Sequence, residues 1–529
     1  MAGLVDPADT PPVVVVGGGP TGLVVALLLA QYGVRTVVLE KFTQQYPLPR
    51  AVHADDEVVR ILQQLGMGEA FGDISRPIPG MRLIDADRRV IADFGRARSS
   101  FGHPQSNLYD QPDLERLLRA AVAQAPEVDL RLGAEVTGLD QRGDGVAVTY
   151  CDEAGQHHLP AAAVLGCDGT NGVVRQWIGA RLVDLHFDER WLVIDVRCAT
   201  RLGCYDGVEQ VSDPARPATY MRVGPDRYRW EFQMRSGEDV AALTSTRSLA
   251  TLLAPWIAGI PVNELTVLRA TEYTFRARIA DRWQQQRVFL LGDAAHQTPP
   301  FIGQGLGLGI RDAHNLAWKL AAELRGANPS LLDSYQAERR PAARALVWAA
   351  VLLGAMMIGG ESRAATTRST LLRTVCRLPG GTRLLASTIT FRLGAGPLVR
   401  PTPRQRITRI GAAGALCPQP WVVDETGSRV RLDDVVGHGF ALISTGGAGA
   451  EARRATWLAG SVGSLARRLG VTTVLVAERP DGEHEGTGDP APADGFRRVV
   501  SADLHSWLRR ACGGSALVRP DRVVLAAAR

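Results

Sequence analysis

The stretch from Val13 to Leu39 constrains this chain most, because it opens with a strand, a glycine-rich turn, a helix and a second strand. The turn reads Gly17-Gly18-Gly19-Pro20-Thr21-Gly22 and matches the pattern Gly-x-Gly-x-x-Gly. Glycine at these positions permits a tight turn and a close approach of the backbone, and the helix N-terminus offers free N–H groups and a positive dipole to a pyrophosphate. The sequence therefore predicts a βαβ unit that binds a dinucleotide.

Glu40 stands at the end of the second strand, about 20 residues beyond the motif, where a carboxylate can accept hydrogen bonds from ribose hydroxyls. A carboxylate there would also repel a 2′-phosphate, so the expected ligand is FAD or NAD and not NADP. No later strand is followed by the same glycine pattern, and the nearest candidate, at 446–449, has the wrong spacing. One dinucleotide is therefore expected to have a dedicated fold.

A second glycine-rich segment follows a short apolar strand at 288–291. The strand ends in Gly292-Asp293, a rigid Pro299-Pro300 follows, and a helix is expected to begin after the glycines at 303, 305 and 307. Such a loop delivers backbone N–H groups to a helix N-terminus, which favours negative charge placed against it. The N1 and C2 carbonyl edge of a reduced flavin carries such charge, so the segment favours a flavin as the ligand.

Composition and charge exclude several classes of protein. The 529 residues are 45% hydrophobic and 22% charged, which is an ordinary balance for a soluble chain of about three domains. The net charge of +5 is too weak to indicate nucleic acid as a partner. The seven cysteines form no Cys-x-x-Cys pair and no Cys/His cluster at zinc spacing, so neither a disulfide framework nor a metal site is expected.

The apolar regions of the sequence do not predict a membrane partner. The N-terminus lacks the basic start and long apolar run of a secretion signal, so we expect a cytoplasmic protein. The nonpolar segment from Ala345 to Gly360 falls short of the roughly 20 residues that span a bilayer. A buried helix is the preferred interpretation of that segment.

Changes of pattern divide the chain into four stretches. Residues 1–185 hold the first part of the dinucleotide-binding domain, and residues 186–280 favour strands and predict a separate sheet-based domain that binds the substrate. Residues 281–400 return to the first domain with long helices and end in a linker rich in Pro and Gly. Residues 401–529, with strands at 440–444 and 471–477, are typical of a small α/β domain.

Three separated motifs together resemble the FAD-dependent aromatic hydroxylases, or class A flavoprotein monooxygenases. They are the glycine motif with Glu40, the Asp168-Gly169 turn after an apolar run, and Gly292-Asp293. Four further stretches look closest to the 3-(3-hydroxyphenyl)propionate hydroxylase branch, namely Pro49 to Glu57, Asp110 to Glu115, Arg229 to Phe232 and Pro299 to Gly305. The match runs over about residues 12 to 395 and more loosely to the end.

This resemblance implies an α/β fold, α+β overall, with a Rossmann-like FAD-binding domain, an inserted β-sheet substrate domain and a C-terminal thioredoxin-like domain. That last domain has no Cys-x-x-Cys after Cys417, which indicates a structural or oligomerisation role and leaves a homodimer open. The implied cofactor contacts are Gly17, Gly19, Pro20, Thr21, Gly22, Glu40, Lys41, Arg50, Gln111, Asp168, Asp293, Pro300, Gly303, Gly305, Leu306 and Gly307.

Several of these positions have distinct implied roles. Glu40 would bind the FAD ribose, Arg50 and Gln111 the pyrophosphate and ribityl regions, and Asp293 the ribityl chain. Backbone amides near Leu306 and Gly307 would face the pyrimidine edge of the flavin. The Asp168 motif, closed by Arg175, is linked in this family to both FAD and NADPH.

Two positions depart from the family pattern. Gly172 stands where the family often has Ser, and Gly307 where it often has Asn. The second change keeps the backbone donor, so flavin binding should survive. The first leaves the contact with NADPH uncertain.

The resemblance also implies a reaction. NADPH or NADH would reduce FAD, O₂ would form a C4a-hydroperoxide, and one oxygen would pass to a phenolic or polyketide aromatic ring. A closed pocket must exclude water, and Tyr220, Trp230, Phe232 and Phe301 are candidates for its walls, although a core position is preferred for each of these rings. His53 and His296 are candidates for a base that deprotonates a phenol, although a hydrogen-bonded structural histidine is preferred at both positions.

Three other functions are compatible in part with a flavin-binding fold. A flavin-dependent halogenase needs a suitably placed lysine and a Trp-x-Trp motif, but only Lys41 and Lys319 occur, neither is well placed, and the motif is absent. A Baeyer-Villiger or epoxidising oxygenase acting on a secondary metabolite stays open, because the same oxygenated flavin serves it. A flavin-binding scaffold without turnover also stays open.

Overall fold

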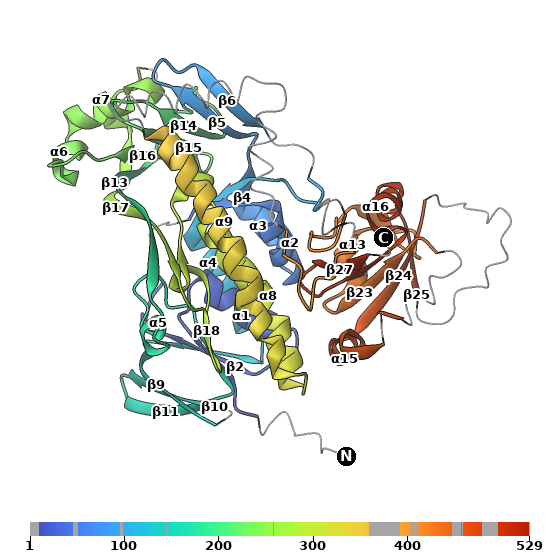
Figure 1. Cartoon of the computed structure of the whole chain (residues 1–529). Helices are drawn as coiled ribbons and strands as arrows, with labels where there is room; N and C mark the ends of the chain where they lie inside the picture. The colour runs from blue at the N-terminus through green and yellow to red at the C-terminus, as the bar shows by residue number, and fades with distance from the viewer. Residues whose placement is uncertain are drawn as a thin grey trace.

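The computed structural model of the chain describes residues 10–45, 51–95, 99–143, 145–257, 259–358, 392–402, 405, 411–446, 456–457, 459–478 and 496–527. Figure 1 shows a large body formed by the chain up to α9 (Asp333–Met357) and a smaller C-terminal body beside α2 (Asp56–Gln64) and α8 (Gly305–Leu324). The helix α9 crosses the front of the large body. The predicted α/β architecture is confirmed.

A six-stranded sheet forms the base of the large body, in the order β18-β19-β12-β1-β2-β8. Its strands are β1 (Val13–Val16), β2 (Thr36–Glu40), β8 (Val128–Leu132), β12 (Ala163–Gly166), β18 (Gln284–Gln285) and β19 (Val288–Leu290). All neighbours pair in parallel except β18 and β19. The all-valine β1 is buried throughout, as expected for a parallel strand covered on both faces, and α1 (Pro20–Ala30) and α4 (Gln111–Ala123) supply part of the cover.

A larger, eight-stranded sheet has the order β20-β17-β13-β16-β15-β14-β5-β6. Its strands are β5 (Gly80–Asp85), β6 (Val90–Gly95), β13 (Leu182–Arg197), β14 (Val208–Ser212), β15 (Ala218–Arg222), β16 (Arg227–Gln233), β17 (Thr266–Ala280) and β20 (His296–Gln297). The sheet thus extends beyond the predicted stretch 186–280, because β5 pairs in parallel with β14 and β6 follows by a hairpin. Such partners, distant in sequence, leave no local signal.

The two faces of this larger sheet pack against different neighbours. The outer face, defined by Ile194, Tyr220, Trp230 and Phe232, packs against Trp256 of α7 (Thr246–Ile257). The inner face, defined by Trp191, Val193, Gln210, Thr219 and Glu231, lies on the side of the 3₁₀ turn η3 (Pro300–Ile302). Successive strand residues point to opposite sides, so each strand contributes to both faces.

Short elements complete the large body. They are β3 (His53–Ala54), α3 (Gly68–Ile74), β4 (Ser75–Pro77), β7 (Asn107–Tyr109), β9 (Glu135–Arg142), β10 (Gly145–Asp152), β11 (Gly155–Ala161), α5 (Val174–Trp177), α6 (Val240–Thr244), η1 (Val262–Glu264), η2 (Gly292–Ala294) and η4 (Pro329–Leu331). Strands β9 to β11 form one three-stranded sheet, and β3, β7 and β4 form another.

The C-terminal body, residues 411–527, is built on a seven-stranded mixed sheet in the order β22-β21-β25-β24-β23-β26-β27. Its elements are β21 (Trp421–Val423), β22 (Arg429–Arg431), α13 (Leu432–Val436), β23 (Phe440–Ser444), α15 (Gly460–Leu469), β24 (Val471–Ala477), β25 (Phe496–Val500), α16 (Ala502–Cys512), β26 (Ser515–Val518) and β27 (Val524–Ala527). Cys417 and Cys512 share its core, and burial raises the pKa of the Cys417 thiol to about 12. A thiol held protonated in this way is inert, which supports a structural role.

Buried ion pairs attach the C-terminal body to the large body. Glu338 of α9 accepts hydrogen bonds from both terminal nitrogens of Arg519 and from Lys319, each at 2.8 Å. At a second point, Asp433 accepts from Arg60 of α2 and from Arg522. Because an unpaired buried charge is costly, these pairs fix the position of one body on the other.

The α9 region is also the part of the chain that most resembles a membrane span. Within the described residues, only Pro329–Met357 is long and apolar enough to cross a bilayer, and half of its most apolar window is buried inside the molecule. The charged side chains of Glu338 and Arg339 on this helix are engaged in ion pairs. These features are those of a core helix, as predicted for the segment that begins at Ala345.

Replacing Glu338 tests the attachment of the C-terminal body. The variant Glu338→Ala leaves Lys319 without its carboxylate and Arg519 with only Asp521, and breaking a buried pair costs about 3–5 kcal/mol. We expect urea unfolding of the full chain to show a destabilisation of that order. The control Glu272→Ala removes a partly exposed partner of Arg190 and should change stability less; equal losses in the two variants would contradict the account.

Candidate active site

The turn before α1 accepts only glycine at two of its positions. A Cβ added to Gly17, whose φ is +105°, would lie 2.5 Å from the carbonyl oxygen of Cys167, and one at Gly22 would lie 2.0 Å from that of Gly17. At Gly19, by contrast, an added Cβ would meet no atom within 4 Å, and no side chain caps the helix. The first amide groups of α1 therefore face open space, which is the arrangement that binds a pyrophosphate.

Glu40 is held beside this turn by two backbone amides. One carboxylate oxygen accepts a hydrogen bond from the amide of Gly18 at 2.6 Å, and the other accepts from the amide of Phe42 at 2.9 Å. The exposed neighbour Lys41 places its ammonium over the ring of Phe42, 5.0 Å from the centroid. The carboxylate is thus oriented at the end of β2, where a ribose is expected.

Asp168 occupies the space that a side chain at position 172 would need. A Cβ at Gly172 would lie 2.2 Å from the Asp168 carboxyl group, so the glycine is a steric requirement of this arrangement. One carboxylate oxygen accepts from the amide of Val174, while the other is buried without a hydrogen bond, and burial raises the pKa of the group. The second oxygen is therefore a buried acceptor without a donor.

The second glycine-rich segment forms the approach to α8. Gly292 and Gly303 have φ of +59° and +64°, and Asp293 between them is exposed, with buried residues on either side. No side chain caps α8, and a Cβ at Gly305 would meet nothing within 4 Å. The α8 amides therefore also face open space, in the place where the pyrimidine edge of a flavin is expected.

The segment from Pro300 to Gly307 leads into the first turn of α8. Pro300 begins η3 and is partly exposed, and Leu306 and Gly307 lie in the first turn of α8. A Cβ at Gly307 would lie 2.7 Å from a terminal nitrogen of Arg311. The guanidinium group of Arg311 donates hydrogen bonds to the carboxylates of Glu57 and Asp55. The missing side chain at 307 is therefore explained by the space that Arg311 fills.

His53 contacts the loop that precedes α8. Its Nδ1 lies 3.1 Å from the carbonyl oxygen of Gly303, and its Nε2 lies 2.6 Å from Oγ of Ser106. Both ring nitrogens are thus engaged with the protein. This geometry favours the structural interpretation of His53 over the role of a base.

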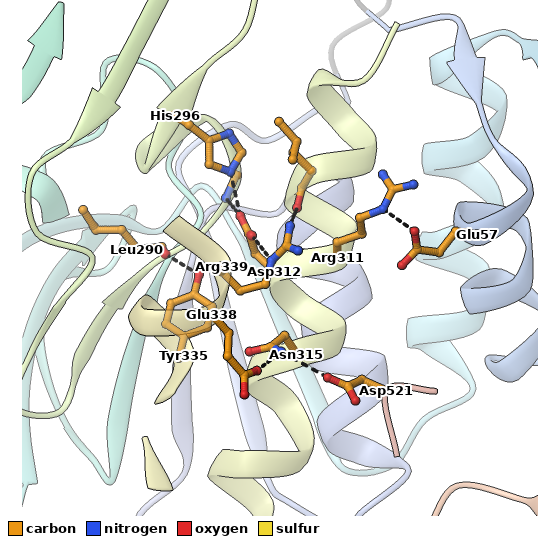
Figure 2. Close-up of polar contacts among 12 residues, drawn as sticks. Glu57, Leu290, His296, Arg311, Asp312, Asn315, Tyr335, Glu338, Arg339 and Asp521 are labelled. Carbon is orange, nitrogen blue, oxygen red and sulfur yellow. Dashed lines mark hydrogen bonds and ion pairs between the residues drawn. The ribbon is translucent and has the colours of Figure 1, made fainter. Parts of the chain in front are cut away.

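His296 is fully buried, and its ring points toward Asp312 of α8, as Figure 2 shows. Its side chain has no exposed surface, and Nε2 lies 2.7 Å from Oδ2 of Asp312, which also accepts from Arg339 through its other oxygen at 2.8 Å. Burial alone would raise the pKa of Asp312, but His296 and Arg339 together hold it below its usual value. His296 therefore supports the start of α8 and does not face a ligand.

Gln111 and Arg50 were predicted to contact the cofactor. The side chain of Gln111 is buried, accepts from the amide of Ala51 at 2.7 Å and donates to Glu115 at 2.8 Å. It therefore orients the segment that follows residue 50. Arg50 lies outside the described residues.

The aromatic residues considered as pocket walls separate into two groups, and three of them occupy the core position that was preferred over a pocket wall. Tyr220, Trp230 and Phe232 lie on the outer face, in a core with Trp256, and not on the side of Phe301. The reason is strand alternation, which turns residues 228, 230 and 232 of β16 to one side and residues 229 and 231 to the other. Phe301 itself contacts the inner face through Trp191 and Phe275.

The inner face carries a row of polar groups that the sequence reasoning missed. Gln210 donates to the carbonyl oxygen of Phe301 at 3.1 Å and accepts from the hydroxyl of Thr219 at 2.7 Å. Thr219 pairs with Glu231, and Asp195 on β13 binds the guanidinium groups of Arg229 and Arg269. The alternation of polar and aromatic residues in Arg227–Gln233 was the available signal.

The geometry defines the class of protein. Two uncapped helix N-termini, open space at Gly19 and Gly305, the oriented Glu40 carboxylate and the exposed Asp293 fit an extended FAD that runs from α1 to α8. The inner face contacts residues 300–302, next to the place where the flavin ring would end. This is the arrangement of a flavoprotein monooxygenase.

Comparison with known proteins agrees with that class. The FAD binding domain model matches residues 10–350, and the HcaD C-terminal domain model matches residues 414–529. A 3-(3-hydroxy-phenyl)propionate/3-hydroxycinnamic acid hydroxylase of Burkholderia vietnamiensis is 34% identical over 97% of this chain and 93% of that protein. A probable NADH-specific resorcinol 4-hydroxylase of Rhodococcus jostii is 38% identical over 67% of each chain.

A solved structure completes the comparison. The anhydrotetracycline hydroxylase OxyS of Streptomyces rimosus aligns with a TM-score of 0.72 and 26% identity over 98% of this chain and 96% of that one. The chain belongs to the FAD-dependent aromatic hydroxylases. It is a monooxygenase that binds FAD, consumes NADH or NADPH and hydroxylates an aromatic ring.

Two glycine variants test the first part of the site. Gly19→Ala adds a methyl group in open space, so we expect the apoprotein to keep its thermal stability while FAD affinity falls at least about tenfold through the lost close approach to the pyrophosphate. Gly22→Ala forces a methyl group against the carbonyl oxygen of Gly17 and should lower the melting temperature of the apoprotein as well. Equal FAD affinity in Gly19→Ala and wild type, measured by flavin fluorescence, would contradict the assignment.

Proposed function

We propose that this chain hydroxylates a small phenolic ring that binds between the inner face and residues 300–305. The observation that carries the proposal is the bond from Gln210 to the carbonyl oxygen of Phe301, which fixes polar inner-face groups beside the loop that meets the flavin. The named activities of the relatives, on hydroxyphenylpropionate and resorcinol, support a substrate of this class.

The parts of the chain then have separate tasks. FAD, when bound, supplies the activation of O₂. The α8 amides would stabilise negative charge at the pyrimidine edge of the flavin, and Glu40 would hold the ribose. Phe187, Trp191 and Phe275 surround Phe301 and would exclude water from the far side of the ring.

The path of the hydride donor and the location of the enzyme belong to the same proposal. The hydride donor is NADH or NADPH, and we propose that the Asp168 turn lies beside its path. Arg175 donates to the carbonyl oxygens of Ala294 and Thr170, so it would couple that turn to the flavin loop without needing a serine at position 172. We further propose that the enzyme acts in the cytoplasm.

Substrate-stimulated turnover tests the proposal. FAD-loaded protein should oxidise NADH or NADPH faster in the presence of resorcinol, 3-(3-hydroxyphenyl)propionate or a related phenol, and ¹⁸O₂ should label a new ring hydroxyl. A product with oxygen inserted between ring carbons would instead support the Baeyer-Villiger reaction. Absence of stimulation by every phenol and polyketide tried would favour a flavin-binding scaffold.

A further inference from the structure

The carboxyl group of Glu231 is buried, and no described residue donates a hydrogen bond to it. It lies in the middle of β16, is 5% exposed and points to the inner face, while its neighbours Trp230 and Phe232 point to the outer core. A buried carboxylate without donors is costly, so such a group is normally paired. The exception calls for a ligand that can supply the missing donor.

The other buried acidic side chains of this sheet are paired, which makes Glu231 distinctive. Asp195 on the inner face binds Arg229 and Arg269. Glu209 on the outer face binds Arg88 at 2.8 Å and the indole nitrogen of Trp256 at 3.1 Å. The chain thus satisfies its structural carboxylates on both faces and leaves one open.

The open carboxyl group lies on the row that leads to the flavin loop. Glu231 pairs with Val193 on one side and Thr219 on the other, and Thr219 pairs in turn with Gln210, whose amide binds the carbonyl oxygen of Phe301. Adjacent strands are about 4.8 Å apart, so Glu231 and Gln210 are separated by about 10 Å across the same face. A ring held against this face would have Glu231 on one side and the loop on the other.

Burial, together with the charges nearby, sets the pKa of Glu231. Burial raises its pKa, Asp195 raises it further, and Arg229 and Arg269 oppose both effects, with a resulting pKa of about 7. Proton transfer is most effective when the pKa of the group lies near the working pH. The carboxyl group can therefore hold or release a proton under ordinary conditions.

We infer that Glu231 accepts the hydrogen bond of the substrate's ring hydroxyl and takes its proton during hydroxylation. The inference rests on the proposed function and assigns a base that neither His53 nor His296 can be, because His53 is engaged at both ring nitrogens and His296 is sealed. The phenolic O–H bond breaks, an O–H bond forms on the carboxylate, and the electron pair stays on the ring oxygen. The hydroxylated ring carbon then releases its hydrogen as a proton to solvent, the electron pair of that C–H bond restores the aromatic ring, and the ring oxygen regains the proton held by Glu231.

A proton count on binding tests the contact without turnover. At pH 7 about half of the Glu231 carboxyl groups are protonated, and the ionised form accepts the hydrogen bond of a phenol more strongly than the protonated form does. Binding of resorcinol to the FAD-loaded enzyme should therefore release a fraction of a proton, up to about one half, measured by calorimetry in buffers of different ionisation enthalpy. Glu231→Gln should bind resorcinol with no release, and equal release in both proteins would overturn the inference.

The reaction rate supplies the second test. With phenols of ordinary acidity, pKa about 10, Glu231→Gln should hydroxylate about 100-fold more slowly in a single turnover. The loss should shrink to about threefold or less for nitro- or fluoro-substituted phenols already ionised at the assay pH. A loss of the same size across the whole series would indicate a structural role and overturn the inference, as would an unchanged rate.

The pH dependence of the hydroxylation rate provides the third test. The base must be ionised, so the wild-type rate should fall as the pH drops through about 7, and Glu231→Gln should lack this limb. Glu231→Asp keeps the carboxylate and should keep the limb, which preserves the test if the glutamine variant folds poorly. A wild-type profile without the limb would overturn the inference.

The control is Glu209→Gln, a buried carboxylate of the same sheet on the opposite face. This variant should be less stable than wild type. Its proton release on binding resorcinol, and the dependence of its hydroxylation rate on the acidity of the phenol, should be the same as in wild type. FAD content and circular dichroism confirm the fold of each variant. If wild-type enzyme hydroxylates phenols and Glu231→Gln behaves as wild type, only the inference fails; if wild type hydroxylates none, the proposed function fails.

Discussion

The close packing of Thr21 between Gly292 and Gly309 places two helices, encoded far apart in the chain, against each other. A Cβ at Gly309 would lie 2.4 Å from the hydroxyl oxygen of Thr21, and one at Gly292 would lie 3.0 Å from it. Only glycine lets α8 and the turn before it approach α1 so closely. Because of this contact, the N-termini of α1 and α8 open onto one region, and a single extended dinucleotide can use both.

The second organising feature is the division of the large sheet into two faces. The outer face is an aromatic core with Trp256, and the inner face holds ionisable groups at positions that alternate with that core. Burying charge is costly, and the chain compensates by pairing Asp195 with two arginines. Glu338 is paired in the same way, with Lys319 and Arg519. These charges hold the C-terminal body in place and take no part in the reaction.

Local patterns predicted local structure well. The strands at 13–16, 440–444 and 471–477 begin and end where expected, and the glycine turns before α1 and α8 have the predicted openness. The sequence could not assign the faces of β16 because Tyr228, Trp230 and Phe232 suit a pocket and a core equally. Long-range pairs such as β5 with β14, or Arg519 with Glu338, leave no periodic signal that a single sequence can reveal.

A crystal structure of the chain with FAD and resorcinol tests the central claim most directly. We predict the adenosine ribose at Glu40, the pyrimidine edge of the flavin at the first amides of α8, and the phenol on the inner face with its hydroxyl group toward Glu231. A flavin that reaches only α1, or a phenol bound against the outer face beside Trp256, would contradict the account.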